Sequence, residues 1–414
     1  MKALLILVAA LPVAWAGELL SAAANDTNVM PDSYIIVMNE GLSDADFDSH
    51  MTWAMDVHNT AVEKRQEATS GVSRTWNAHQ MKGYCGSFDR ETIQEIANNS
   101  DVAYVEPDRM METSAFVTQR NAPSYGLGRI SHKNPGNRDY IFDRSAGRGI
   151  TIYGVDTGID IQHPEFEGRI TWGSNQVNNV DQDENGHGTH TAGTFAGTTF
   201  GVAKQANIVA VKVLNGRGRG SASGIISGMN FCVNHAKQNN LLGRAVMNLS
   251  LGGGGTRAFN QAATNAVNAG IFLAVAAGND GVSLDSWPRH KQKSLTLLQR
   301  DAANTSPASA RGVCTVAAST ENDARARFSN FGAVVAVYAP GDKITSAAPG
   351  GGSKVLSGTS MAAPHVAGVG AYLMALEGIT SDQVCNRIKS LAQPVISDQG
   401  AGTTNKLLYN NSGV

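Results

Sequence analysis

This 414-residue sequence has few aromatic residues (6%), few charged residues (16%) and only four cysteines. Its formal net charge is −2 and it has no long Lys/Arg run, so we expect no nucleic-acid partner. Beyond its first residues no segment offers about 20 consecutive apolar residues, so we expect no membrane partner. The 42% hydrophobic content is nevertheless enough for a large core, which is typical of a globular protein.

The first residues are typical of a secretory signal peptide. Lys2 is followed by the apolar run 4–11 and by Ala14-Trp-Ala16, which predicts a signal over residues 1–16, with cleavage as late as about residue 22. We therefore expect a secreted, extracellular protein. In an oxidising compartment the four cysteines permit three full pairings, and sequence alone does not choose among them. Glycosylation sequons stand at Asn25, Asn98, Asn304 and Asn410, and a further one at Asn248 lies in an apolar segment.

Residues 33–108 are predicted to form a small α+β domain. Strand-like segments at 33–38, 84–88 and 102–107 alternate with helical segments at 47–69 and 90–98. This order favours a ferredoxin-like β-α-β-β-α-β domain. Residues 109–134 are polar and rich in glycine and proline, which indicates a linker.

Residues 135–400 have a different pattern, and residues 401–414 are expected to be a C-terminal tail. Nearly continuous apolar segments at 149–155, 206–214, 244–249 and 271–277 alternate with Ala-rich helical segments. This alternation predicts an α/β domain with a mostly parallel sheet covered on both faces. Functional groups in such sheets lie at the carboxyl ends of the strands.

Three polar residues stand at such positions. Ser360 lies in a Gly-Thr-Ser turn before a predicted helix, where a serine can be a helix cap or a nucleophile. Asp156 ends a predicted strand, and His187 opens an Ala/Gly-rich helix. A nucleophile, a base and a carboxylate that fixes the imidazole are the groups that acyl transfer requires.

With these motifs, in the chain order Asp, His, Ser, the sequence resembles a secreted subtilisin-like serine protease of the proteinase K branch, of fungal type. The resemblance implies a subtilisin-like three-layer domain and a serine endopeptidase with a triad of Asp156, His187 and Ser360. The N-terminal unit resembles an inhibitor-type propeptide, which acts as intramolecular inhibitor and folding assistant and leaves near residues 113–117. Substrates would be proteins and peptides, and we expect a monomer.

The resemblance also implies the remaining site residues. Asn279 matches the oxyanion-hole amide, and the small residues of the pocket wall leave room for a large apolar or aromatic P1 side chain, with broad specificity. Arg219 and its neighbour Arg217 are either solvated loop charges or side chains that favour acidic residues in the distal part of the substrate. The substrate-binding residues implied are Gly218, Arg219, Gly220, Ser250, Leu251, Gly252, Gly253, Ala276, Ala277 and Gly278.

No cofactor is implied for the chemistry. Calcium is the usual structural ion of the family, but Ala336 stands at the position of its main carboxylate ligand, which weakens that expectation. His187 and His190 have a spacing that a zinc site could use, but the HExxH glutamate is missing. The family pattern implies a Cys314–Cys385 disulfide. Cys85 would leave with the propeptide, and Cys232 would remain as a buried, inert thiol.

Two other functions compete with this interpretation. An esterase or amidase could use the same chemistry on the same scaffold. A non-catalytic or impaired homologue could act through its inhibitor-like N-terminal domain, although the presence of all three triad residues argues against it.

Residues 282–299 have no counterpart in the family pattern. They are basic, and their ends can be encoded by intron donor and acceptor sequences at Val282-Ser283 and Leu298-Gln299. We interpret them as a retained intron; the alternative is a surface-loop insertion.

Transcript sequencing distinguishes these interpretations. A spliced message that joins Gly281 to Arg300 is expected. Detection of a peptide from within residues 282–289 in the secreted protein would contradict the intron and establish the loop.

Overall fold

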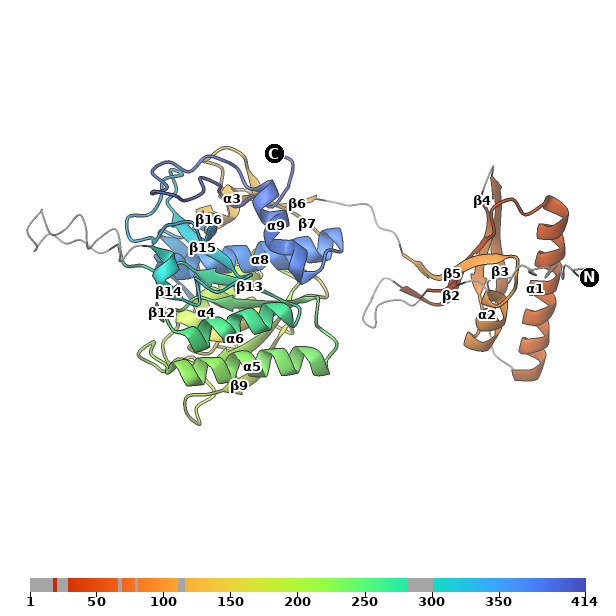
Figure 1. The fold of residues 1–414 in the computed structure, drawn as a ribbon, viewed down its shortest axis with the longest axis horizontal. Helices are drawn as coiled ribbons and strands as arrows, with labels where there is room; N and C mark the ends of the chain where they lie inside the picture. The colour runs from red at the N-terminus through yellow and green to blue at the C-terminus, as the bar shows by residue number, and fades with distance from the viewer. Residues whose placement is uncertain (1–17, 21–28, 66–68, 79–80, 111–115, 282–300) are drawn as a thin grey trace, which may run out of the picture. The chain divides into compact units, whose positions relative to one another are not determined.

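The computed structural model describes residues 18–20, 29–65, 69–78, 81–110, 116–281 and 301–414 (Figure 1). The predicted signal peptide 1–16, Asn25 and the segment 282–299 lie outside these residues. The chain divides into two compact units, Met1–Thr113 and Ser114–Val414. Within the described residues no helix is both long and apolar enough to cross a membrane.

The N-terminal unit is a five-stranded sheet with two helices. The strand order is β1-β5-β2-β4-β3, so the ferredoxin-like order β2-α1-β3-β4-α2-β5 is confirmed, with β1 added beside β5. Sequence reasoning did not locate β3, because most of its residues are exposed and polar. The elements are β1 (Glu18–Leu19), β2 (Val29–Met38), α1 (Asp44–Arg65), β3 (Gly71–Ala78), β4 (Met81–Ser87), α2 (Arg90–Ala97) and β5 (Val102–Arg109).

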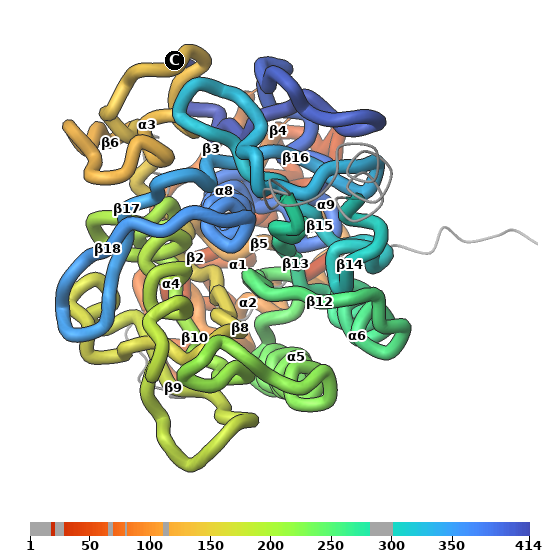
Figure 2. The backbone as a smooth tube through the Cα atoms, turned by 90° about the vertical axis from the view of Figure 1, so that its left-hand side faces the viewer, coloured from red at the N-terminus to blue at the C-terminus, as the bar shows by residue number. Residues whose placement is uncertain are grey.

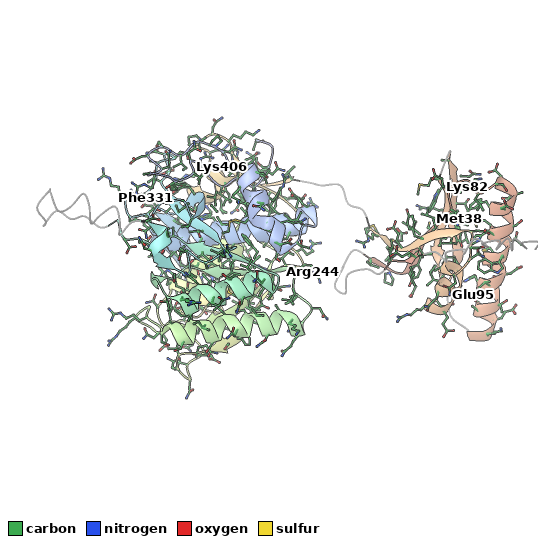
Figure 3. All side chains as sticks on the ribbon, in the orientation of Figure 1. Met38, Lys82, Glu95, Arg244, Phe331 and Lys406 are labelled. Carbon is green, nitrogen blue, oxygen red and sulfur yellow. A yellow bond between two sulfur atoms is a disulfide. The ribbon has the colours of Figure 1, made fainter. Side chains whose placement is uncertain are left out.

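Helix α2 shows how local sequence and packing cooperate in this unit. Its N-cap Asp89 accepts hydrogen bonds from the backbone amides of Glu91 and Thr92, which satisfies donors that the first turn leaves unpaired. Ile93 and Ile96 lie on one face of the helix and are at most 1% exposed. They pack into the same core as Met38 of β2, which is labelled in Figure 3. Each buried isoleucine contributes roughly 1.5–3 kcal/mol.

A seven-stranded sheet forms the centre of the second unit. Its order is β16-β15-β13-β11-β8-β10-β9, and all neighbouring strands are parallel. The prediction of a parallel sheet is confirmed. Its strands are β8 (Thr151–Asp156), β9 (Ile170–Asn175), β10 (Asn207–Lys212), β11 (Ala245–Leu249), β13 (Ile271–Ala276), β15 (Cys314–Ser319) and β16 (Val335–Pro340).

Two hydrophobic cores cover the two faces of this sheet. On β13, Phe272 and Ala274 belong to one core, while Leu273 and Val275 belong to the other, as the two-residue period of a strand requires. Because helices cover both faces of the sheet, the side chains on both faces of these strands are buried, and the strands are uniformly apolar (Figure 1). The first core includes α4 (His187–Ala196), α8 (Thr359–Glu377) and α9 (Ser381–Leu391), and the second includes α5 (Ala222–Gln238) and α6 (Arg257–Asn268).

Short elements complete the second unit around the sheet (Figure 2). Two of them, β17 and β18, form a hairpin, β12 pairs with β14, and β6 pairs with β7. Their bounds are β6 (Phe116–Gln119), α3 (Tyr125–Ser131), β7 (Tyr140–Asp143), η1 (Pro164–Phe166), β12 (Gly253–Gly254), η2 (Ala302–Asn304), β14 (Thr305–Ser306), β17 (Ile344–Ala348) and β18 (Gly352–Leu356).

The predicted linker 109–134 is wrong over most of its length. Strand β6 and helix α3 are part of the second unit, which begins before the predicted residue 135. Arg129 of α3 is buried and donates from Nε and Nη2 to Asp323 at 2.7 and 2.9 Å. The glycines in this segment indicated a loop, so the helix was not predicted. Glycine is nevertheless needed in the helix, because a Cβ on Gly128 would lie 2.2 Å from the Asn137 carbonyl oxygen.

The predicted tail 401–414 is also wrong as a separate segment. Leu407 and Leu408 are fully buried. The Tyr338 amide, in edge strand β16, donates to the Lys406 carbonyl, and the Leu408 amide donates to the Tyr338 carbonyl. This segment therefore covers the edge of the sheet and belongs to the domain.

The structure contains the Cys314–Cys385 disulfide that the resemblance implies. It joins β15 to α9. Cys232 of α5 is fully buried, and burial raises the pKa of its thiol far above the ordinary value. Cys85 lies in the N-terminal unit and is not bonded to another cysteine.

Thiol titration tests this assignment. The mature protein, without its N-terminal unit, should show no reactive thiol when native, because a buried neutral thiol is a poor nucleophile. In denaturant it should show one. Three thiols would contradict the disulfide.

Candidate active site

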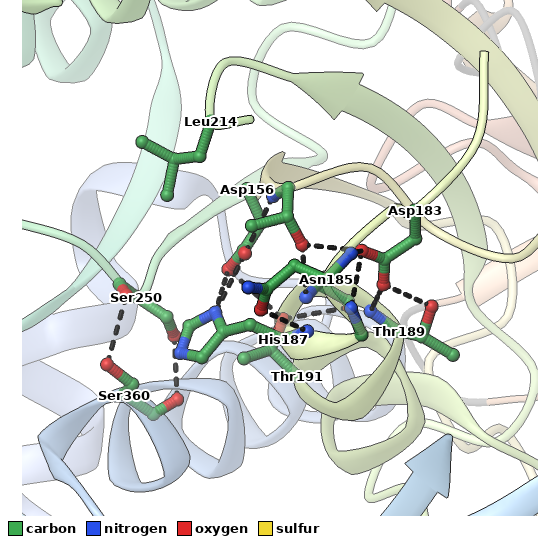
Figure 4. Close-up of polar contacts among 12 residues, drawn as sticks. Asp156, Asp183, Asn185, His187, Thr189, Thr191, Leu214, Ser250 and Ser360 are labelled. Carbon is green, nitrogen blue, oxygen red and sulfur yellow. Dashed lines mark hydrogen bonds and ion pairs between the residues drawn. The ribbon is translucent and has the colours of Figure 1, made fainter. Parts of the chain in front are cut away.

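The three predicted catalytic residues lie at the end of one strand of the large sheet and at the starts of two helices that pack in its first core. Asp156 is the last residue of β8, His187 the first of α4, and Ser360 the second of α8. Parallel strands end at one edge of a sheet, so the loops after them meet there. Figure 4 shows the His187 ring between the Asp156 carboxylate and the Ser360 side chain.

Asp156 holds the imidazole of His187. The Nδ1 atom of His187 lies 2.7 Å from Oδ1 and 3.0 Å from Oδ2 of Asp156, which is fully buried. The Thr157 amide also donates to Oδ1. A proton on Nδ1 leaves Nε2, the nitrogen nearer Ser360, as an acceptor.

The charges around His187 favour its protonated form. Burial alone would lower the pKa of His187, but the charge and hydrogen bond of Asp156, together with the charge of Asp183, hold it above the ordinary value. Lys354 of β18 acts in the opposite direction. Its Nζ lies beside Gly186, 2.7 Å from where a Cβ would stand.

Ser360 is hydrogen-bonded to Ser250, the residue that directly follows β11. Its Oγ donates to the Ser250 carbonyl at 3.0 Å, and the Ser250 Oγ donates to the Ser360 carbonyl at 2.8 Å. The Ser360 amide belongs to the first turn of α8, where backbone N–H groups have no partner within the helix. These amides carry partial positive charge, which favours an oxyanion beside them.

Asn279 is oriented by the residue before the serine. Its Oδ1 accepts hydrogen bonds from the amide of Thr359 at 2.8 Å and from the Thr359 hydroxyl at 3.0 Å. Because Oδ1 is occupied, Nδ2 remains as the donor of this side chain. Gly358 lies beside this nitrogen, since a Cβ on Gly358 would be in van der Waals contact with it at 3.5 Å.

Asn330 holds the turn that carries Asn279, and sequence reasoning missed it. Its Nδ2 donates to the Ala277 carbonyl and to Oδ2 of Asp280, and its Oδ1 accepts from the Asp280 amide. Gly278 has φ +105°, and a Cβ there would lie 2.4 Å from Nδ2 of Asn330. The Ser-Asn-Phe sequence around Asn330 carries no local signal for this contact.

A groove of about 1100 Å³ passes these residues. It brings together all the predicted site residues except Asp156 and Ala277. Ala277 is fully buried, and its amide donates to the Val316 carbonyl, so its prediction as a substrate-binding residue is wrong for the side chain. The groove is also lined by residues that were not predicted to bind substrate, which are Thr157, Asn185, Leu214, Ile225, Gly254, Asp280, the sequon residue Asn304, Thr305 and Thr359.

Comparison with known proteins identifies the family. Residues 147–406 match the Subtilase family. The chain belongs to the subtilase family. Residues 33–114 match the family described as peptidase inhibitor I9.

Fungal relatives match nearly all of the chain. A subtilisin-like protease of Coccidioides posadasii is 72% identical over 413 residues, which are 100% of this chain and 99% of that protein. Subtilisin-like protease 9 of Arthroderma benhamiae is 55% identical over 392 residues, covering 94% and 93%. The crystal structure of a cold adapted subtilisin-like serine proteinase has 42% identity and a TM-score of 0.61, covering 70% of this chain and 98% of that one. The predicted fold and enzyme class, a subtilisin-type serine endopeptidase with an inhibitor-type N-terminal domain, are confirmed.

His190 is not available to bind zinc in this subtilase. Its Nε2 lies 3.0 Å from the Ile344 carbonyl and 3.2 Å from that of Lys354, both in the β17–β18 hairpin. Burial lowers the pKa of His190 to about 4. Its function is therefore to fix the hairpin against α4.

Ala336 offers no carboxylate to calcium at the family position. Among the described residues no three His, Cys, Asp or Glu side chains are grouped to hold a metal ion. The residues around Ala336 therefore do not fit the family's main calcium site. Binding elsewhere stays an open prediction from the resemblance.

The described sequons differ in their surroundings. Asn98 is exposed after α2. Asn304 is exposed but lines the groove, where a glycan would compete with substrate. Asn410 and Asn248 are fully buried, and the Asn410 Nδ2 donates to the Ile141 carbonyl, so a glycan at Asn410 is incompatible with this fold.

Proposed function

We propose that this subtilase is a secreted endopeptidase of broad specificity, made as a self-inhibited zymogen, with Ser360 as nucleophile, His187 as base and Asp156 as its partner. The observation that carries the proposal is the His187 ring, hydrogen-bonded to buried Asp156 on one side and facing Ser360 on the other. The nucleophile, the base and the orienting carboxylate thus lie side by side in the order that proton transfer requires.

The reaction begins with a change of partner at Ser360. Its hydroxyl, which donates to the Ser250 carbonyl, rotates toward Nε2 of His187 and gives up its proton as Oγ attacks the substrate carbonyl carbon. The Asp156 carboxylate stabilises the imidazolium that forms. His187 then gives the proton to the leaving amine as the C–N bond breaks, which leaves the acyl group on Oγ of Ser360. A water molecule next gives a proton to His187 as it attacks the acyl carbon, and His187 returns this proton to Oγ as the C–Oγ bond breaks and the acid leaves.

Two donors receive the developing oxyanion. One is Nδ2 of Asn279, whose amide Thr359 orients, and the other is the Ser360 amide at the start of α8. Preorganised donors of this kind are worth on the order of 10²–10³ in turnover each.

Glycine-rich edges support binding of an extended peptide. Residues 218–220 and 250–254 line the groove, and glycines allow a substrate backbone to approach for main-chain hydrogen bonding. The pocket near Ala276 and Gly278 has small residues, which favours a large apolar or aromatic P1 side chain. Arg219 at the rim remains either a solvated charge or a contact for acidic distal residues.

The inhibitor-type domain supports synthesis as a zymogen. Cleavage near Thr113 would leave β6, which begins at Phe116, intact and paired with β7, whereas cleavage after Val117 would cut that strand. We therefore place the maturation site at the early end of the predicted range. The signal-like start supports secretion, and we propose that the mature enzyme is a monomer.

The serine and the specificity are tested together. Ser360→Ala should remain an uncleaved zymogen that does not react with a serine-directed phosphonate, because the nucleophile is absent. Wild-type enzyme on a peptide library should cleave after large apolar or aromatic residues at many sites. Strict cleavage after Arg, Lys or Asp would contradict the proposed P1 preference, and phosphonate labelling of Ser360→Ala would contradict the nucleophile.

The pH dependence tests His187 and its surroundings. Because only the neutral imidazole accepts the proton, kcat/KM should fall as the pH drops through the raised pKa of His187. Lys354→Met removes a positive charge that lowers this pKa, so the acid limb should move to higher pH. Lys343→Met, in the turn before β17, is the matched control and should leave the limb in place. An unmoved or oppositely moved limb in Lys354→Met would contradict this charge balance.

A further inference from the structure

One buried carboxylate beside the site has no assigned role. Asp183 precedes α4, is 9% exposed and does not line the groove. Both of its oxygens accept hydrogen bonds. Oδ1 accepts from the Thr157 hydroxyl (2.7 Å) and the amides of Asn185 (3.1 Å) and Gly186 (2.7 Å), and Oδ2 accepts from the amide (2.9 Å) and hydroxyl (2.6 Å) of Thr189.

These donors come from the two segments that carry Asp156 and His187. Thr157 directly follows Asp156, while Gly186 and Thr189 flank His187 (Figure 4). The Thr157 hydroxyl in turn accepts from the Gly188 amide at 3.0 Å, which closes the network. Asp183 is therefore a common acceptor for both segments.

The two segments touch too closely to shift independently. A Cβ on Gly188 would lie 2.0 Å from the Gly158 carbonyl oxygen and 3.1 Å from Cβ of Asp156. Five donors directed at one buried side chain also require an acceptor-only group, because an amide nitrogen in its place would face donors and leave them unpaired.

We propose that Asp183 is a positioning residue of the reaction, whose carboxylate holds the turn after Asp156 and the first turn of the His187 helix in one register. It acts through these segments and touches no substrate. The proposal rests on the triad proposed above.

The charge of Asp183 predicts a shift in the pH dependence of the reaction that a packing role alone would not produce. The charged and titratable groups that face His187 are Asp156, Asp183, Lys354 of β18 and His190 of α4. Glu184 is exposed and pairs with Lys212 of β10. Asp183 raises the pKa of His187, so its neutralisation should move the acid limb to lower pH, opposite to Lys354→Met.

The experiment compares three variants of the full-length protein. Kinetic constants are expressed per active site titrated with a phosphonate, so that loss of folded enzyme does not count. Asp183→Asn should lower kcat on the order of 10²-fold with KM nearly unchanged, because misplacement of about 1 Å has that effect. Its acid limb should move to lower pH.

Thr189→Val and Asp181→Asn are the matched variants. Thr189→Val removes one donor to Asp183, together with the acceptor of the Asp160 amide, and keeps the charge, so kcat should fall about fivefold with the limb in place. Asp181→Asn removes an exposed charge from the same loop, where solvent screens it, so neither kcat nor the limb should change.

Three results would overturn the proposal: kcat of Asp183→Asn within twofold of wild type, a rise in KM that accounts for the loss, or an acid limb that does not move. If Asp183→Asn yields no titratable sites, Thr189→Val decides: unchanged kcat per site overturns the proposal. Failure of the triad itself is distinguishable, because Ser360→Ala would then retain activity.

Discussion

Parallel pairing of β8 with β10 and β11 is the constraint on which the site depends. Asp156 at the end of β8 stands opposite Lys212 of β10, and Asn248 of β11 stands opposite Gly154. The backbone continues this pairing beyond the strands, since the amides of Val213 and Leu214 both donate to the Asp156 carbonyl. The position of the carboxylate is therefore set by sheet hydrogen bonds and not by a loop.

A buried ammonium accompanies this buried carboxylate. Lys212 is fully buried, and its Nζ donates to the carbonyls of Thr157 and Leu214 while lying 3.3 Å from Oε2 of Glu184. Buried charges are costly unless their hydrogen bonds are satisfied, and here one partner is the Thr157 carbonyl in the turn after Asp156, while the other, the Leu214 carbonyl, lies just after β10. The same turn is held by Asp183 from the other side, so two opposite charges fix its shape.

Much of this architecture follows from local patterns. The apolar runs predicted β8, β10, β11 and β13, and the strand-end aspartate and helix-opening histidine predicted a site at one edge. What local patterns could not give are contacts between distant segments. Asn330 lies about fifty positions from the turn that it holds, and helix α3 owes its place to the Arg129–Asp323 pair, 194 positions apart.

The error at residues 116–134 and 401–414 has the same origin. Both segments are irregular or rich in glycine, which indicates exposed loops on composition alone. Each nevertheless has a buried part, residues 124–131 in the first and 407–410 in the second, because these parts find partners that only the fold provides. Ser412, for example, donates from its hydroxyl to the Ser131 carbonyl at the end of α3.

The distance between the base and the nucleophile depends on how closely two helices pack. His187 and Ser360 open α4 and α8, which share the first core. A Cβ on Gly368 of α8 would lie 2.8 Å from the carbonyl oxygen of Phe195 in α4. Glycine thus lets the two helices approach, and any larger residue would push their N-termini apart. The chemistry consequently depends on a contact in the hydrophobic core, two helical turns from the serine, because a rigid helix transmits displacement along its length.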